Sequence, residues 1–307
     1  MRKVVFFVNP LLVARRGRRA VVERCAALLR DDGCTVEVQE TISDHRAGEQ
    51  ARAAIERGCD TVFVCGGDGT LFHVLQGVAG TNAGIGVVPF GTGNVLAQNL
   101  RLPRNPLAAF ELQRKAEAVS IPLGEAMCGG RNWCFLLAAG VGMHAAVMDL
   151  APNGAGKRVW GRVAYYAGGI RLLLRHPIQP VDVEMTGAGG DVKRFRACEV
   201  LAVRAARIGL WRAGGDLRAP QLRMAAVPEA GRFGLTHALV HALAGSMKNR
   251  ESRLCFPRYE EAMEIACTPA GSAPLLVEAD GEVIGTGSAI FRVAEKQVRL
   301  LWPGALR

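Results

Sequence analysis

The chain has 307 residues, half of them apolar and 21% charged, with a formal net charge of +10. This length suits two domains with separate cores, and the composition is typical of a globular protein. No stretch approaches eighteen apolar residues, which argues against a membrane-spanning helix and leaves peripheral contact as the expected mode of membrane association.

The basic surplus fits either a solvated, Arg-rich surface or a surface for anionic membrane lipid. No recognisable nucleic-acid-binding module accompanies the charge, so nucleic acid is not an expected partner. Nine cysteines occur without a C-x-x-C pair or zinc-finger spacing, and most lie among apolar neighbours. The apolar run at the start of the chain ends at Asn9 and is too short for a signal peptide. Together with the cysteine pattern, it predicts a cytoplasmic protein that is peripheral at the inner membrane face.

The first third of the chain alternates between strand and helix patterns. The expected strands are 4–8, 35–39, 61–65 and 85–89, and the expected helices are 20–29, 47–55, 71–78, 95–100 and 105–111. Such alternation predicts an α/β domain with a parallel sheet and helices on both faces. We assign residues 1–120 to it.

From Ser120 onward, short apolar or alternating runs predict a mostly antiparallel β-sandwich domain over residues 121–307. The expected strands are 133–138, 181–185, 198–203, 222–227, 284–293 and 297–302, and the last of them could pack back on the first domain. A basic amphipathic helix at 160–175 and a basic run at 248–253 suit either a membrane surface or ordinary packing and solvation. His237 and His241 are expected to be structural.

The chain is organised around a glycine-rich turn at residues 66–70, Gly-Gly-Asp-Gly-Thr, between a buried strand and a helix. Glycines there permit positive φ and let backbone N–H groups approach a ligand. These N–H groups and the helix N-terminus favour phosphate oxygens. Asp68 repels a bare phosphate, so it is expected to act through Mg²⁺, a hydroxyl or a backbone N–H.

A second turn of this kind follows the next strand, at residues 90–94, Phe-Gly-Thr-Gly-Asn. The carboxyl ends of neighbouring parallel strands face the same crevice, so both turns are expected to line one site.

These two turns, with Val8-Asn9-Pro10 and Asp280-Gly281-Glu282, resemble the diacylglycerol kinase catalytic domain family, which includes bacterial lipid kinases and sphingosine and ceramide kinases. The resemblance implies a nucleotide domain, a β-rich lipid-substrate domain, and ATP and Mg²⁺ as cofactors. The metal ligands stay unassigned. The implied partners are ATP, a lipid alcohol of diacylglycerol or sphingoid type and an anionic membrane surface. The oligomeric state stays open, a homodimer included.

The resemblance also implies the roles of individual residues. Asp280 and Glu282 are both candidates for the general base, with Asp68 also in the catalytic set. Asp280-Gly281 has the alternative of a plain type I′ hairpin turn, and Thr41 that of capping the next helix. The implied nucleotide contacts are Asn9, Pro10, Thr41, Gly66, Gly67, Asp68, Gly69, Thr70, Leu71, Phe72, Gly91, Thr92 and Asn94.

Four positions depart from the family's usual acids: His73, Val95, Pro122 and His144. They motivate two rival hypotheses. One is a nucleotide-binding, membrane-associated regulatory protein that has lost turnover, and the other is a soluble-substrate kinase of the NAD-kinase type. Because the glycine turns and both candidate bases are present together, we favour an ATP-dependent lipid kinase.

Overall fold

The computed structural model describes residues 1–142, 144–146, 179–209, 211–228 and 258–304. The chain divides into two compact units, Met1–Leu123 with Glu295–Arg307 (unit 1) and Gly124–Ala294 (unit 2). The basic helix predicted at 160–175 and the basic run at 248–253 lie outside the described residues. His237 and His241 also lie outside them. The predicted division of roles, nucleotide binding before residue 121 and lipid binding after it, stays a prediction.

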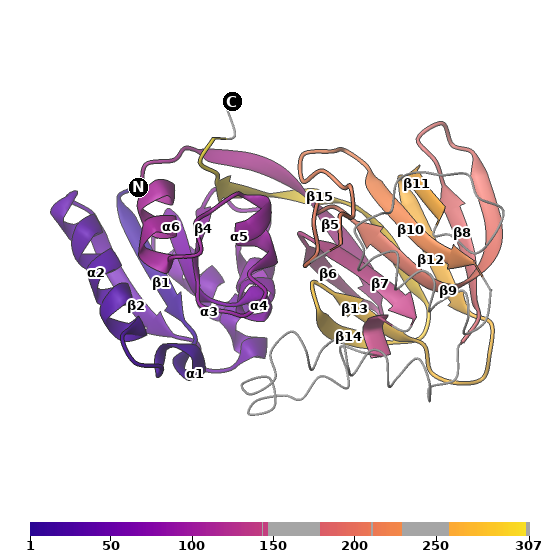
Figure 1. Ribbon diagram of the computed structural model, residues 1–307, viewed down its shortest axis with the longest axis horizontal. Coiled ribbons are helices and arrows are strands. Elements are labelled where there is room, and N and C mark those ends of the chain that lie inside the picture. Colours follow the sequence, from indigo (N-terminus) through magenta and orange to yellow (C-terminus); the bar gives the residue numbers. More distant parts are fainter. Residues whose placement is uncertain (143, 147–178, 210, 229–257, 305–307) are drawn as a thin grey trace. The chain divides into compact units, whose positions relative to one another are not determined.

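Unit 1 alternates strands and helices along the chain (Figure 1). Its strands are β1 (Lys3–Val8), β2 (Thr35–Glu40), β3 (Thr61–Gly66) and β4 (Gly84–Pro89). Its helices are α1 (Pro10–Val13), α2 (Arg18–Asp31), α3 (Asp44–Glu56), α4 (Asp68–Val78), α5 (Val95–Asn99) and α6 (Pro106–Gln113). The four strands pair in parallel in the order β2-β1-β3-β4. In such a sheet, ligands bind at the carboxyl ends of the strands where the order switches, here between β1 and β3.

Helices cover both faces of this parallel sheet. Along β1, Val4 and Phe6 pack in one apolar cluster with residues of α2 and α6, whereas Val5 and Phe7 are buried on the opposite face. On that side α3 and α4 pack so closely that a Cβ on Gly77 would lie 1.9 Å from the carbonyl oxygen of Gly48. The predicted α/β region is therefore confirmed.

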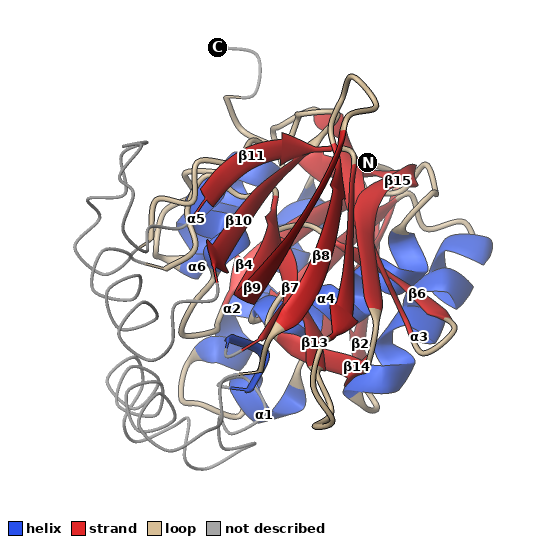
Figure 2. Cartoon of the chain, turned by 90° about the vertical axis from the view of Figure 1, so that its right-hand side faces the viewer, coloured by secondary structure: helices blue, strands red, loops and turns tan. Residues whose placement is uncertain are grey.

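Unit 2 is rich in antiparallel strands, several of which are seen side by side in Figure 2. They are β6 (Arg131–Phe135), β7 (Ala138–Gly142), β8 (Val181–Thr186), β9 (Val192–Val203), β10 (Leu222–Pro228), β11 (Arg258–Ala262), β12 (Glu264–Pro269), β13 (Leu276–Ala279) and β14 (Glu282–Thr286). Strands β5 (Ala118–Cys128) and β15 (Ala289–Leu301) each have residues in both units. The sheet runs β14-β13-β7-β9-β8-β12-β15, which confirms the predicted antiparallel β-rich region.

Several boundaries differ from the sequence prediction. The run expected as one strand over 133–138 is divided by a bend at 136–137 into the end of β6 and the start of β7. The run expected as one strand over 284–293 is broken at Gly287, whose φ of +106° ends β14. The runs at 289–293 and 297–302 instead form the single strand β15, whose end pairs with β4 through Arg299 and Leu300. Among the described residues, no helix is long and apolar enough to cross a membrane.

Candidate functional site

The carboxyl ends of β1, β3 and β4 are joined by backbone hydrogen bonds. The N–H of Asn9 donates to the carbonyl of Cys65 at 3.1 Å. The N–H groups of Phe90 and Gly91 both donate to the carbonyl of Gly66, at 2.9 and 3.2 Å. The two glycine turns predicted to line one site therefore lie side by side.

Close packing explains why the turns need glycine. A Cβ on Gly91 would lie 2.6 Å from Cα of Gly67, and one on Gly93 would lie 2.8 Å from Oδ2 of Asp68. Neither turn contains a glycine with positive φ. The freedom of glycine to adopt positive φ is therefore not used in these turns; these positions exclude a side chain because the two turns approach each other closely.

Asp68 ties the first turn to the second. Its Oδ1 accepts hydrogen bonds from the N–H groups of Val95 at 2.7 Å and Leu96 at 3.5 Å, at the start of α5. Burial raises the pKa of Asp68 above its ordinary value, while the backbone N–H donors lower it. Of the three partners expected for this carboxylate, the structure provides the backbone N–H.

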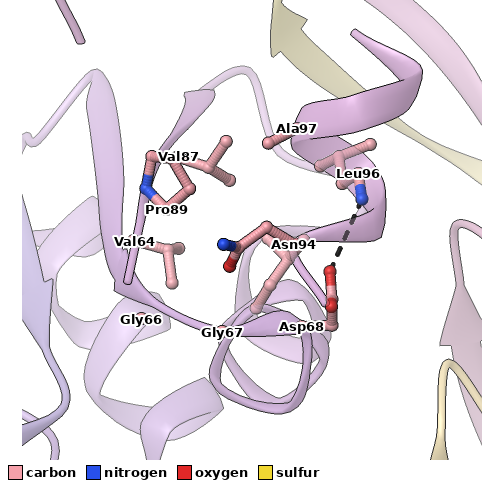
Figure 3. Close-up of a pocket in the computed structure, with 10 residues that line it drawn as sticks. Val64, Gly66, Gly67, Asp68, Val87, Pro89, Asn94, Leu96 and Ala97 are labelled. Atoms are coloured by element: carbon pink, nitrogen blue, oxygen red, sulfur yellow. Dashed lines mark hydrogen bonds between the residues drawn. The ribbon is translucent and has the colours of Figure 1, made fainter. Parts of the chain in front are cut away.

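Asn94 and Thr92 have different surroundings within the second turn. Asn94 adopts a left-handed φ of +47°, and its amide both accepts from the N–H of Gly91 and donates to the Gly91 carbonyl. Thr92 is exposed. A hollow between the turns is lined by Asp68 and Asn94 beside apolar side chains such as Leu96 (Figure 3). Thr92 is thus better placed than Asn94 to offer a side chain to a ligand.

Asn9 connects the first loop of unit 1 to the glycine turn. Its Nδ2 donates to Oγ1 of Thr70 at 3.0 Å, and its Oδ1 accepts from the N–H of Leu11, which caps the one-turn helix α1. Pro10 follows as the first residue of α1, because its missing N–H costs nothing there.

Three other predicted contact residues are enclosed by protein. Thr41, Leu71 and Phe72 are at most 4% exposed, so their side chains are not available to a ligand in this structure. Helix α3 is capped at Ser43 rather than Thr41, and the capping alternative for Thr41 was therefore wrong. Gly69 lies in the first turn of α4.

Arg18 was not singled out in the sequence. Its guanidinium donates to the carbonyls of Leu12 and Phe90, at 3.2 and 2.8 Å, and stacks 5.2 Å from the Phe90 ring centre. Burial and the charge of Arg15 lower the pKa of Arg18. No sequence signal could have found this bond between residues 72 positions apart, although Arg18 stands in a visibly basic segment.

In unit 2, Asp280 and Gly281 form the turn between β13 and β14, with φ of +49° and +87°. Positive φ at both positions is the signature of a type I′ hairpin turn, so that interpretation of the backbone is confirmed. The Asp280 carboxylate accepts hydrogen bonds from the N–H groups of Leu136, Leu137 and Ala138, at 2.7 to 3.1 Å. It thereby fixes the bend between β6 and β7.

The same turn gathers further ionisable groups. Burial, together with the charge of Glu278, raises the pKa of Asp280 to about 7 against the effect of its three N–H donors. Glu278 is almost fully buried and lies 3.3 Å from Nδ1 of His144. Glu282 begins β14 and is partly buried. Glu278 was missed by sequence reasoning, although it stands two positions before Asp280 in a strand.

The described residues contain no cluster of three or more His, Cys, Asp or Glu side chains arranged to hold a metal ion. A single carboxylate that shares a magnesium ion with nucleotide phosphates needs no such cluster. The carboxylate of Asp68, which lies at the glycine turns, offers oxygen ligands of the kind that suits such an ion.

Fold and site together define a class: a doubly wound α/β unit with paired glycine turns, followed by an antiparallel β-rich unit. Comparison with known proteins shows which family the chain resembles. Residues 3–126 match the model of the diacylglycerol kinase catalytic domain, which confirms the predicted resemblance.

Two curated relatives carry related names. The chain is 34% identical over 193 residues to a diacylglycerol kinase of Mycobacterium tuberculosis (strain CDC 1551 / Oshkosh), and the match covers 60% of each chain. It is 32% identical over 174 residues to a "Probable lipid kinase YegS-like" of Xanthomonas campestris pv. campestris (strain 8004), covering 54% of this chain and 55% of the relative. The matched segments thus span between half and two thirds of these relatives.

Solved structures share the fold over the whole length. A crystal structure of a diacylglycerol kinase from Bacillus anthracis str. Sterne superposes with a TM-score of 0.72 at 18% identity, covering 100% of this chain and 98% of that one. At this identity the likeness concerns the fold.

Proposed function

We propose that the protein is an ATP-dependent lipid kinase, which transfers the γ-phosphate of ATP to the hydroxyl of a diacylglycerol-like or sphingoid lipid. The observation that carries the proposal is the pair of glycine turns held together by Asp68 at the carboxyl ends of β3 and β4. The names of the relatives, diacylglycerol kinase and lipid kinase, support the same reaction class.

The phosphate-holding role belongs to unit 1. Backbone N–H groups at the start of α4 and the exposed hydroxyl of Thr92 would bind the ATP phosphates. Asn9 and Asn94 would act indirectly, because their amides hold the surrounding loops. When bound, Mg²⁺ neutralises phosphate charge, and the carboxylate of Asp68 would hold it.

The proton-accepting role belongs to the acidic turn of unit 2. As the lipid hydroxyl oxygen bonds to the γ-phosphorus and the bond to the bridging oxygen of ADP breaks, the hydroxyl proton passes to a carboxylate. Both oxygens of Asp280 already accept backbone N–H groups. We therefore assign the proton to Glu282 and give Asp280 the task of shaping the turn.

The test is phosphoryl transfer from labelled ATP, with Mg²⁺, to mixed micelles that contain diacylglycerol, sphingosine, ceramide or phosphatidylglycerol. The wild type should label one lipid, and Asp68→Ala should reduce the rate at least about 100-fold. The matched control is Glu184→Gln, which removes a surface acid paired with Arg194 and should keep the rate. ATP binding without transfer to any lipid would overturn the proposal in favour of a regulatory protein, and transfer only to a soluble alcohol would favour the NAD-kinase-type alternative.

A further inference from the structure

Behind the Asp280–Gly281 turn lies a second carboxylate that the proposed reaction does not use. Glu278, in β13, is 1% exposed, and its Oε2 accepts the N–H of Gly281 at 2.9 Å. Gly281 immediately precedes Glu282. Glu278 therefore holds the backbone from which the proposed proton acceptor projects.

A buried carboxylate is costly unless a counter-charge compensates it. His144, two residues beyond the end of β7, supplies one: its Nδ1 lies 3.3 Å from Oε1 of Glu278, at ion-pair distance. Its backbone N–H also donates to the carboxylate of Glu199 in β9. His144 is thus held by acids from two strands, its imidazole beside Glu278 and its backbone N–H by Glu199.

We propose that His144 and Glu278 are positioning residues, which hold the Asp280–Gly281 turn and hence Glu282 in place while His144 carries a proton. For its catalytic consequence, this inference rests on the proposed function. The structural part of the inference is that a protonated His144 is coupled to the Gly281 amide, and this part does not depend on the reaction.

The direction of the pH dependence follows from the groups around His144. The charged groups recorded against it in the described part of the chain are Glu278 and Glu199, and Asp280 in turn interacts with Glu278. Burial alone would lower the pKa of His144, but Glu278 and then Glu199 raise it above the ordinary 6.5. The ion pair is therefore intact below that raised pKa and is lost as the pH rises through it and His144 gives up its proton.

NMR titration of the full chain with labelled histidine and backbone nitrogen tests the pair without any assay of activity. His144→Asn identifies the His144 signal by its loss. In the wild type, His144 should titrate above pH 6.5, and the Gly281 amide shift should follow with the same midpoint. Glu278→Gln should lower the His144 pKa by about one unit or more, Glu199→Gln by less, and the surface control Glu184→Gln should leave it unchanged.

The inference is overturned if His144 titrates at or below pH 6.5, or if Glu278→Gln leaves its pKa unchanged. The inference is also overturned if the Gly281 amide shift does not change as His144 titrates, because the protonation of His144 would then have no effect on the turn.

A kinetic measurement tests the consequence for catalysis. In the wild type, kcat should fall as the pH rises through the NMR-determined pKa of His144. His144→Asn should lower kcat about 10-fold at pH 6, remove that fall, and leave KM for ATP unchanged, since the ATP contacts lie in unit 1. An unaltered pH profile in His144→Asn contradicts the positioning role. A wild type that phosphorylates no lipid contradicts the proposed function instead, and the NMR titration still decides whether the pair exists.

Discussion

Two turns of this molecule place an aspartate beside a glycine, and in both turns the carboxylate accepts backbone N–H groups from another segment. Asp68, in unit 1, accepts N–H groups at the start of α5, and Asp280, in unit 2, accepts three N–H groups from the bend between β6 and β7. Burial raises the pKa of both carboxyls. In each case the acid joins its own turn to a segment remote in sequence.

The glycines near the two aspartates are needed for different reasons. Gly91 and Gly93, in the neighbouring turn that Asp68 contacts, are required by close approach, since a Cβ there would lie under 3 Å from another residue. Gly281 is required by its φ of +87°. The dipeptide Asp-Gly therefore does not by itself tell a packed phosphate loop from a hairpin turn, and the neighbouring elements decide between them.

The largest expected difference between the turns is in their response to pH. The pKa of Asp280 is raised from 3.8 to about 7, so the stability linked to its protonated form is present at low pH and lost as the pH rises toward 7. Asp280→Asn has no such loss. Between pH 5 and pH 8, the unfolding free energy of wild type relative to Asp280→Asn should fall by about 2 to 3 kcal/mol in urea denaturation.

Asp68→Asn provides the comparison in the other turn and should show a change of the same sign. A constant difference between wild type and Asp280→Asn across this pH range would show that the Asp280 carboxyl has an ordinary pKa.

The packing of the glycine turns is tested by Gly91→Ala. The added Cβ would lie 2.6 Å from Cα of Gly67, where only backbone could give way, so the unfolding free energy should fall by about 2 kcal/mol. Gly84→Ala is the matched control, because its nearest atom would lie at 3.5 Å, an ordinary contact. Equal stability of the two variants would contradict close packing of the turns.

Replacement of Asp68 should have a smaller effect on the free energy of unfolding. Asp68→Ala takes away the acceptor for the N–H groups of Val95 and Leu96 at the first turn of α5, a loss of about 1 kcal/mol by analogy with helix caps. Asp68→Asn keeps an oxygen in place and should lose less. Thermal unfolding of both variants measures the difference, and identical values would mean that the cap contributes nothing.

The smallest expected effect concerns Asn9. Asn9→Ala loses the cap of the short helix α1 and the bond to Thr70, and should cost about 0.5 to 1 kcal/mol in urea denaturation. Asn132→Ala, on an exposed strand end, is the control and should stay within about 0.5 kcal/mol of wild type. A change in Asn9→Ala no larger than in the control would remove Asn9 from the structural account.

Much of the fold was predictable because its signals are local. Periodicities of two and 3.6 residues in the first hundred positions gave the strands and helices of unit 1 and the placing of both glycine turns at strand ends. Strands β5, β11, β12 and β13 were not predicted, because short strands without a clean alternation resemble the turns between them. The break at Gly287 was missed for the same reason.

The contacts of the site could not be predicted, because they depend on distance through space. Asp68 and Val95 are 27 residues apart, and Asp280 and Leu136 are 144 apart. A local pattern identifies Asp280 as a turn residue, but only the pairing of β13 with β7 brings it to its three donors. The coupling of His144 to Glu278 is of the same kind.

The most direct test measures ATP binding and phosphoryl transfer in the same preparations of wild type, Glu282→Gln and the surface control Glu184→Gln. If unit 1 holds ATP and Glu282 receives the proton, Glu282→Gln should bind ATP with a Kd within about twofold of wild type. It should transfer phosphate to lipid at least about 100-fold more slowly, and the control should match wild type in both. Transfer by Glu282→Gln at the wild-type rate, or a wild type that binds no ATP, would contradict this division of roles.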